Sequence, residues 1–243
     1  MSEQNQPVAT TNNNKKAPKK NKQSDILFNI KKNGRHINGW YNFIRIFILP
    51  LVRLVSPFKI IGTKKVNDGA CVYVSNHFSM VDPMYLMPTT KESVHFICKQ
   101  EALSIPVLGF FVRRVKAIPV SRDGNDVRAV MNGLKCLKNG DKLAIYPEGR
   151  RNKVSEELQS FESGSAMLAI RAKAPIVPVV IYKRPKLFRK NYAIIGEPFE
   201  LSEYYGVKLT DEILQEADHK ISERMKQMRA DFATQLEAAK GRK

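Results

Sequence analysis

Residues 72–83 read Val-Tyr-Val-Ser-Asn-His-Phe-Ser-Met-Val-Asp-Pro. The first three residues are the β-branched and aromatic types that are typical of a buried strand near its end. Pro83 suits the first position of a helix, and Asp82 suits the N-cap before it. His77 therefore lies on a strand-to-helix loop, with four residues between it and the predicted cap. At this spacing a carboxylate can bind one imidazole nitrogen and leave the other free as a base.

A loop histidine and a capping aspartate alone are most simply surface features. A second segment strengthens the interpretation that His77 is a base. Residues 146–151 read Tyr-Pro-Glu-Gly-Arg-Arg and follow the strand-like run 142–145. Both segments thus follow predicted strands, whose carboxyl ends form the usual binding edge of an α/β sheet. Guanidinium groups pair with phosphate oxygens through two hydrogen bonds. The segment is therefore a candidate phosphate site, with an ordinary charged turn as the alternative.

Together these segments resemble the 1-acylglycerol-3-phosphate (lysophosphatidic acid) acyltransferase family of glycerophospholipid acyltransferases. The family's first block, Asn-His-x-x-x-x-Asp, corresponds to Asn76, His77 and Asp82, and its third block corresponds to residues 146–151. The fourth block, an apolar strand containing proline, corresponds to residues 176–180. The second block is matched by Lys99, Glu101, Pro106, Gly109, Ile118, Val120 and Arg122. All four occur in family order within roughly residues 70–182.

The resemblance implies an α/β fold, a glycerolipid-acyltransferase-like αβ sandwich, to which we add an N-terminal interfacial membrane helical segment. It implies transfer of an acyl chain from acyl-CoA or acyl carrier protein to 1-acylglycerol 3-phosphate (lysophosphatidic acid), which gives phosphatidic acid. His77 would be the general base, and Asp82 would orient it. The acceptor phosphate would be held by residues of the third block, with Arg122 as a second candidate: Glu148, Gly149, Arg150 and Arg151. Glycerol 3-phosphate or another lysolipid remains an alternative acceptor.

Three positions depart from the family pattern. Arg150 stands where the family usually has Thr, Glu162 replaces a basic residue, and Lys116 replaces a glycine. Arg150 either binds the acceptor phosphate beside Arg151 or pairs with Glu162. An exposed ion pair contributes at most about 1 kcal/mol, whereas a desolvated phosphate contact contributes more. We therefore favour the phosphate role.

The composition describes one basic domain of 243 residues with a net charge of +18. Such an excess of positive charge predicts a polyanionic partner, either nucleic acid or an anionic membrane surface. A nucleic-acid-binding protein would explain the charge but neither the sequence blocks nor the apolar run 40–55, so we expect no nucleic acid partner. The cysteines and histidines lack ligand spacing, which predicts no metal, no disulfide and a reducing compartment: Cys71, Cys98, Cys136, His36, His77, His95 and His219.

We divide the chain into a disordered basic tail (1–25), a membrane-associating helical segment (26–65) and an acyltransferase domain (66–243). Residues 40–55 are strongly apolar, but they include Arg45, Pro50 and Arg53. A helix over residues 39–55 would be about 25 Å long, which is short for a hydrocarbon core of about 30 Å. We expect it to lie in the interface, on the cytoplasmic face of a membrane. A buried helix of the soluble core is the alternative.

The remaining pattern alternates strands and helices. Strands are expected at 93–98, 115–120, 142–145, 176–182 and 192–195, helices at 126–137 and 161–173, and a loop at 102–111. A C-terminal amphipathic helix should pack its apolar stripe on the core, through Ile213, Ala217, Ile221, Met225, Met228, Phe232 and Leu236. Ser79 lies two residues from His77, which leaves a Ser-His hydrolase as an alternative enzyme, although no nucleophile elbow surrounds it.

Overall fold

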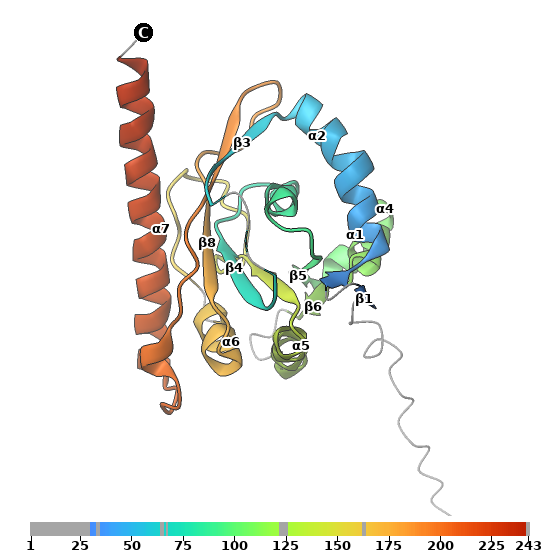
Figure 1. Ribbon diagram of the computed structural model, residues 1–243, viewed down its shortest axis with the longest axis vertical. Helices are drawn as coiled ribbons and strands as arrows, with labels where there is room; N and C mark the ends of the chain where they lie inside the picture. Colours follow the sequence, from blue (N-terminus) through green and yellow to red (C-terminus); the bar gives the residue numbers. More distant parts are fainter. Residues whose placement is uncertain are drawn as a thin grey trace, which may run out of the picture.

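The computed structural model describes residues 30–32, 35–63, 66, 68–121, 126–161 and 164–241. The predicted tail 1–25, Arg122 and Glu162 lie outside these residues. In the described part, a mixed sheet has the strand order β3-β9-β8-β4-β7-β5-β6, and β8 and β9 form its antiparallel pair (Figure 1). The strands are β3 (Phe58–Gly62), β4 (Cys71–Ser75), β5 (Val94–Lys99), β6 (Ile118–Val120), β7 (Lys142–Ile145), β8 (Ile176–Ile181) and β9 (Asn191–Ile195). A separate hairpin joins β1 (Ile30–Lys32) and β2 (Arg35–Ile37).

The central strand β4 organises the sheet. It pairs in parallel with β7 on one side and β8 on the other, and every residue of these three strands is buried. Val72 and Val74 contribute to one apolar cluster, whereas Tyr73 contributes to another. Successive side chains of a strand point to opposite faces, so the sheet is covered on both sides. The expected αβ sandwich is confirmed.

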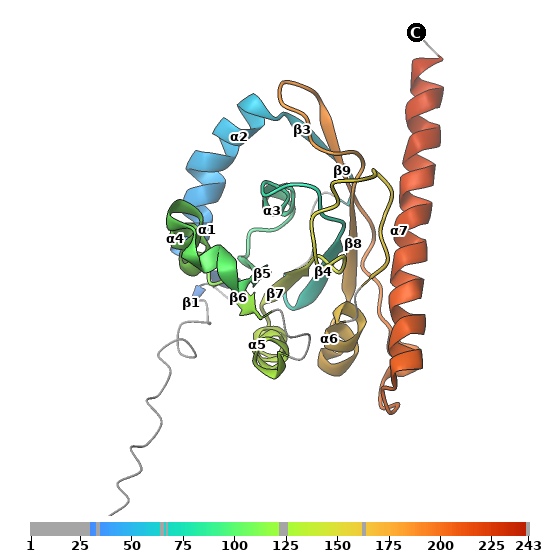
Figure 2. The same cartoon turned by 180° about the vertical axis from the view of Figure 1, so that it is seen from behind.

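Different helices cover the two faces (Figures 1 and 2). One face carries α5 (Val127–Lys138), α6 (Ser165–Ala172) and the long α7 (Asp211–Lys240). The other carries α1 (Gly39–Phe43), the π-helical turn η2 (Ile44–Ile48), α2 (Leu49–Val55), α3 (Pro83–Leu86) and α4 (Pro106–Arg114). Short 3₁₀ turns complete the described elements: η3 (Met87–Thr89), η4 (Gln100–Ser104) and η5 (Ser202–Tyr204).

Two elements differ from the sequence prediction. The expected loop 102–111 is wrong, because its residues form η4 and most of α4. Pro106 occupies the first turn of α4, where a proline is tolerated. Gly109 allows close packing, since a Cβ there would lie 2.2 Å from the Leu103 carbonyl oxygen. The strand expected at 115–120 begins only at Ile118, after Lys116, whose φ of 59° is incompatible with a strand.

The predicted helices are better matched. The predicted helix is confirmed as α5, and the carboxylate of its N-cap Asp126 accepts from the Ala129 amide. Val127 and Met131 of this helix are exposed. Helix α6 begins at Ser165 rather than 161. The predicted C-terminal helix is confirmed as α7, with Ala217, Ile221, Met225 and Phe232 buried against the sheet.

The N-terminal helical run passes through a π turn, where the Leu49 amide donates to the Ile44 carbonyl, and it continues as α2 with Pro50 in the first turn. Its inward side is mixed: Tyr41, Ile44 and Leu49 are buried in an apolar cluster, and Arg45 donates to the Thr90 carbonyl at 3.0 Å. Other apolar side chains face outward and are exposed: Phe43, Ile46, Phe47, Leu51 and Leu54. None of the described helices combines the length and apolar character needed to cross a membrane.

Candidate active site

His77 and Asp82 are in direct contact. Nδ1 of His77 lies 2.7 Å from Oδ2 of Asp82, and the same oxygen accepts from the backbone amides of Phe78 (2.6 Å) and Ser79 (2.7 Å). The side chain of Asp82 is fully buried, whereas that of His77 is 20% exposed. Asp82 occupies the predicted N-cap position before Pro83, but it has helical φ and ψ and makes no side-chain cap bond to α3. Its carboxylate turns back over the loop instead.

This contact prepares the imidazole for proton transfer. The carboxylate accepts a hydrogen bond from Nδ1–H, which keeps the ring proton on Nδ1 and leaves Nε2 unprotonated in the neutral ring. Two backbone amides fix the carboxylate, so its position does not depend on the histidine alone. The partly exposed His77 can thus act as a base through Nε2.

Two asparagines hold the loop in place. Asn76 donates through Nδ2 to the Ile181 carbonyl at 3.0 Å, and its Oδ1 accepts from the Ile181 amide at 2.8 Å. The Asn152 amide donates to the His77 carbonyl at 2.7 Å, and its side chain closes a turn by accepting from the Ser155 amide at 3.0 Å. Sequence reasoning missed Asn152, for which an Asn directly after the basic turn was the available signal.

Tyr146 forms a wall of the site. Its ring stacks on that of His77, with centroids 4.3 Å apart and planes 25° apart. Burial raises the pKa of Tyr146 well above its ordinary value, and the nearby Asp82 carboxylate adds to this effect. The Tyr146 hydroxyl and Oδ1 of Asp82 are both buried without a hydrogen-bond partner among the described residues. The phenol therefore stays neutral beside the imidazole.

The remaining third-block residues form the next part of the site. Glu148 is buried, Gly149 has a φ of 61°, and Arg150 and Arg151 are exposed. Burial raises the pKa of the Glu148 carboxyl to about 7, Asp82 adds slightly, and the backbone amides of Gln159 and His77 oppose this. At neutral pH a large share of this carboxyl is therefore uncharged, which lowers its repulsion of an anionic substrate.

A pocket of about 310 Å³ brings Glu148 and Arg150 together with Gln159 and Ser160. Arg151 is not part of its lining, and Arg122 lies outside the described residues. Neither Arg150 nor Arg151 makes a side-chain hydrogen bond or ion pair to another residue within the described ranges. The proposed pair of Arg150 with Glu162 stays a hypothesis, because Glu162 also lies outside them.

Replacing Arg150 with threonine is expected to raise the KM for the phosphorylated acceptor about ten-fold, equivalent to about 1.4 kcal/mol. The KM for the thioester should not change, because the guanidinium would contact only the phosphate. Steady-state kinetics with each substrate varied in turn provide the measurement. Lys153→Thr, at a nearby exposed cation, is the matched control. An unchanged acceptor KM, with strong coupling between Arg150 and Glu162 in a double-mutant stability cycle, would favour the ion pair.

Ser79 does not form a dyad with His77. Its amide donates to Asp82, and its hydroxyl accepts from the Val81 amide at 3.4 Å. Within the described part of the chain, the His77 ring bonds to the Asp82 carboxylate and not to a hydroxyl. This arrangement disfavours the Ser-His hydrolase.

One buried cluster was not visible in the linear spacing. His95, Cys136 and Asp141 each place a potential ligand atom within 4.8 Å of the others. His95 Nδ1 bonds to the Lys116 carbonyl at 2.8 Å, and Asp141 accepts from the Asn139 amide group at 2.8 Å. The cluster adjoins the starts of β5 and β7, at the opposite strand ends from His77. We interpret it as a buried polar network, and the absence of a metal stays a prediction.

Comparison with known proteins now adds to this geometry. The family model described as Acyltransferase matches residues 57–182, just over half of the chain. The chain is 36% identical to the human 1-acyl-sn-glycerol-3-phosphate acyltransferase beta over 118 residues, which are 45% of this chain and 40% of that protein. It is 29% identical to the Bacillus subtilis 1-acyl-sn-glycerol-3-phosphate acyltransferase over 144 residues, or 56% and 70% of the two chains.

A chloroplastic relative from Brassica napus, also a 1-acyl-sn-glycerol-3-phosphate acyltransferase, is 29% identical over 171 residues, 65% of this chain and 47% of that protein. The chain thus spans about half the length of the curated relatives it matches. Among solved structures, the LPA acyltransferase PlsC from Thermotoga maritima matches with a TM-score of 0.58 and 23% identity. That match covers 78% of this chain and 83% of the other, and it supports the fold.

Proposed function

The chain belongs to the Acyltransferase family, and we propose on that basis that it acylates the free hydroxyl of 1-acylglycerol 3-phosphate to give phosphatidic acid. The observation that carries the proposal is the contact of His77 with Asp82, which leaves Nε2 available at a partly exposed position. The names of the similar proteins favour this acceptor over other lysolipids.

The proposed reaction is a direct transfer. Nε2 of His77 takes the hydroxyl proton while the acceptor oxygen attacks the thioester carbonyl. The tetrahedral intermediate then collapses, its carbon–sulfur bond breaks, and the sulfur takes the proton back from His77 as a thiol. Asp82 stabilises the imidazolium that exists between these steps. No enzyme-bound acyl group is required, which agrees with the position of Ser79.

The acceptor phosphate is assigned to the pocket of Glu148 and Arg150, with Arg151 beside it. A guanidinium binds phosphate oxygens with defined geometry, so it can fix the distance between the acceptor hydroxyl and His77. Positioning of this kind supplies a large part of the rate enhancement when the chemical base is a single histidine.

We further propose that the outward apolar side of α1, η2 and α2 lies on an anionic membrane at its cytoplasmic face. Leu187 and Phe188 extend this surface, because the Phe188 amide donates to the Val55 carbonyl at 2.7 Å and both side chains are exposed. Their loop also carries Lys186, Arg189 and Lys190. Basic residues near anionic lipid contribute roughly 1 kcal/mol each. The enzyme would thereby meet a substrate that resides in the bilayer.

Replacing both Phe43 and Phe47 with serine is expected to weaken binding to anionic vesicles at least about ten-fold, because two exposed aromatic side chains would no longer enter the lipid. Vesicle sedimentation measures the binding. The matched control is Val127→Ser with Met131→Ser on α5, since those side chains are similarly exposed (69% and 59%, against 42% and 60%). Unchanged vesicle binding by the phenylalanine variant would contradict the membrane assignment.

A thiol-release assay with acyl-CoA and a panel of acceptors tests the proposed activity. Lysophosphatidic acid should be the best substrate, ahead of glycerol 3-phosphate and of lysolipids whose phosphate carries a headgroup. A preference for glycerol 3-phosphate would move the chain to a different step of glycerolipid synthesis. Failure to release thiol with every acceptor, for both acyl-CoA and acyl carrier protein as donors, would reject the function.

A further inference from the structure

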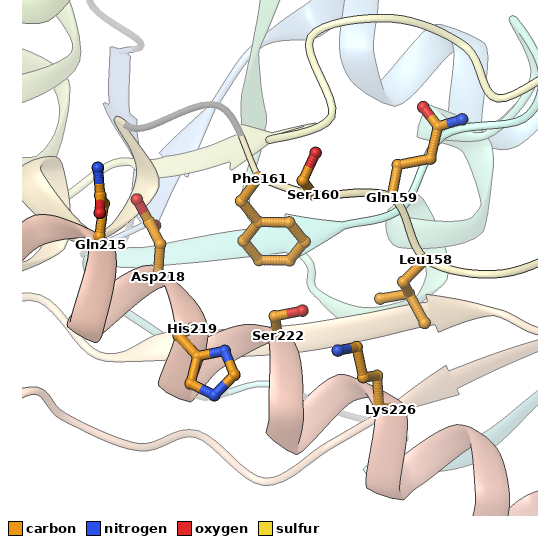
Figure 3. A pocket seen from close by; sticks show the side chains of 9 residues that line it. All are labelled: Leu158, Gln159, Ser160, Phe161, Gln215, Asp218, His219, Ser222 and Lys226. Atoms are coloured by element: carbon orange, nitrogen blue, oxygen red, sulfur yellow. The ribbon is translucent and has the colours of Figure 1, made fainter.

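A second pocket adjoins the site on the side of α7 (Figure 3). It has a volume of about 470 Å³, which lies within the range of small-molecule sites. Figure 3 shows Gln215, Asp218, Ser222 and Lys226 of α7 facing the segment 158–161 across it. Most of its lining side chains are amides, hydroxyls or charged groups, so it is a polar pocket.

This pocket adjoins the proposed acceptor site. Gln159 and Ser160 line both it and the pocket of Glu148 and Arg150. The Gln159 backbone amide donates to Oε1 of Glu148 at 3.5 Å, and the Asn152 backbone amide donates to the His77 carbonyl. Segment 159–160 therefore separates the two pockets, and hydrogen bonds link it through Glu148 to the acceptor site.

Each of the two pockets is lined by a residue that has a buried acceptor atom without a hydrogen-bond partner among the described residues. Oδ1 of Asp218 accepts from the Ser165 hydroxyl at 2.7 Å and the Ala166 amide at 3.2 Å, but Oδ2 has no hydrogen-bond partner among the described residues. Oε2 of Glu148 is also buried without a hydrogen-bond partner among the described residues. Asp218 is 5% exposed and Glu148 is 2% exposed. A buried acceptor without a donor is costly, so Oδ2 of Asp218 indicates a ligand in the α7 pocket that donates hydrogen bonds.

The lining excludes two of the groups that the proposed reaction must bind. An acyl chain would leave the polar side chains of the pocket unsatisfied. A phosphate deep in the pocket would meet the carboxyl group of Asp218. A neutral chain of amide and hydroxyl groups fits better, because it can donate to Asp218 and exchange hydrogen bonds with Gln159 and Gln215.

We propose that this pocket binds the pantetheine arm of the acyl donor, which presents its thioester to His77 past Gln159 and Ser160. Pantetheine carries two amides and hydroxyl groups along one chain, and both acyl-CoA and acyl carrier protein hold their acyl group on it. Lys226 at the rim, 2.7 Å from Glu223, lies near the phosphate end of the arm. The inference rests on the proposed thioester-dependent function, and it assigns that function a donor subsite.

Donor kinetics of pocket variants test the assignment. Gln215→Ala and Ser222→Phe should raise the KM for acyl-CoA five-fold or more, and leave the KM for lysophosphatidic acid within two-fold. Thr234→Phe, at an exposed position further along α7, is the control for a bulky substitution and should change neither KM. Thermal unfolding identifies a variant that has lost its fold, in which case Gln215→Ala alone decides.

Truncated donors separate the arm from the rest of the donor. With S-acyl pantetheine the variants should show the same loss as with acyl-CoA, whereas with S-acyl N-acetylcysteamine, which lacks most of the arm, they should match the unmodified protein. If acyl carrier protein is a donor, the variants should show the same rise in KM with acyl carrier protein as with acyl-CoA. If it is not a donor, the rise should appear with acyl-CoA alone. An equal loss with all thioesters, or no loss with any, would overturn the donor subsite. Absence of transfer by the unmodified protein from any thioester would instead reject the proposed function.

Discussion

Replacing His77 with alanine is expected to lower kcat by at least about 10³-fold, because the acceptor hydroxyl would lose its base. General-base catalysis accounts for about 10²–10⁴-fold in enzymes. The remaining rate enhancement comes from positioning, which alanine leaves in place. The acceptor is assigned to residues 148–151, so lipid binding should remain close to that of the unmodified protein. Single-turnover transfer and separate binding of the lysolipid to the protein measure the two effects.

The neighbouring Ser79 provides the control for this experiment. Ser79→Ala should retain near-normal turnover, since its hydroxyl accepts only a weak 3.4 Å bond from the Val81 amide. Loss of activity in Ser79→Ala, accompanied by an acylated serine in unmodified protein, would support the hydrolase alternative. Turnover near the normal level in His77→Ala would remove the central assignment.

Asp82→Asn is expected to lower kcat by about 10³–10⁴-fold, although it removes no atom from the substrate pocket. An asparagine carbonyl oxygen can still accept from the Phe78 and Ser79 amides, so the loop should keep its shape. The asparagine cannot stabilise the imidazolium as a carboxylate does. When its NH₂ group faces the ring, it donates to Nδ1, the ring proton moves to Nε2, and the base is lost. The chemistry should therefore suffer much more than the fold.

The pH dependence of kcat and thermal unfolding distinguish these two effects. The variant should unfold within a few degrees of the unmodified protein and keep its acceptor KM. Asp82→Glu restores the charge with one added methylene, so it should recover a measurable part of the lost rate. If the asparagine variant instead turned over within three-fold of normal, the carboxylate would have only a structural role.

The contact between His77 and Asp82 could be predicted from sequence because both residues lie on one short loop. His77 and Asp82 are five positions apart, so most conformations of this short loop keep their side chains close to each other. The direction of the Asp82 side chain was beyond such reasoning, because capping α3 and binding His77 are both compatible with the same spacing. The choice depends on the Phe78 and Ser79 amides, which the loop conformation places around one oxygen.

Longer-range features were less accessible. The apolar run 40–55 predicted a helix. Which of its sides faces the protein depends on residues distant in the sequence, such as Thr90, whose carbonyl accepts from Arg45. The second pocket joins Gln159 to Ser222, and nothing in the local sequence of either predicts the other. Glycine and proline in 102–111 favoured a loop, although in this fold they permit α4 to begin at Pro106 and to pack closely at Gly109.

The pairing of β3 with β9 has a consequence for synthesis of the chain. Phe58 pairs with Asn191, whose side chain also binds the Ser56 hydroxyl and the Pro57 carbonyl at 3.0 and 3.2 Å. Roughly 130 residues separate these partners, and ribosomes add about 5–20 residues per second. The apolar helical run therefore leaves the ribosome many seconds before its edge strand can dock. During that interval the nascent chain exposes Phe47 and Leu54 without a folded domain behind them, so early contact with a bilayer or a chaperone would protect it from aggregation.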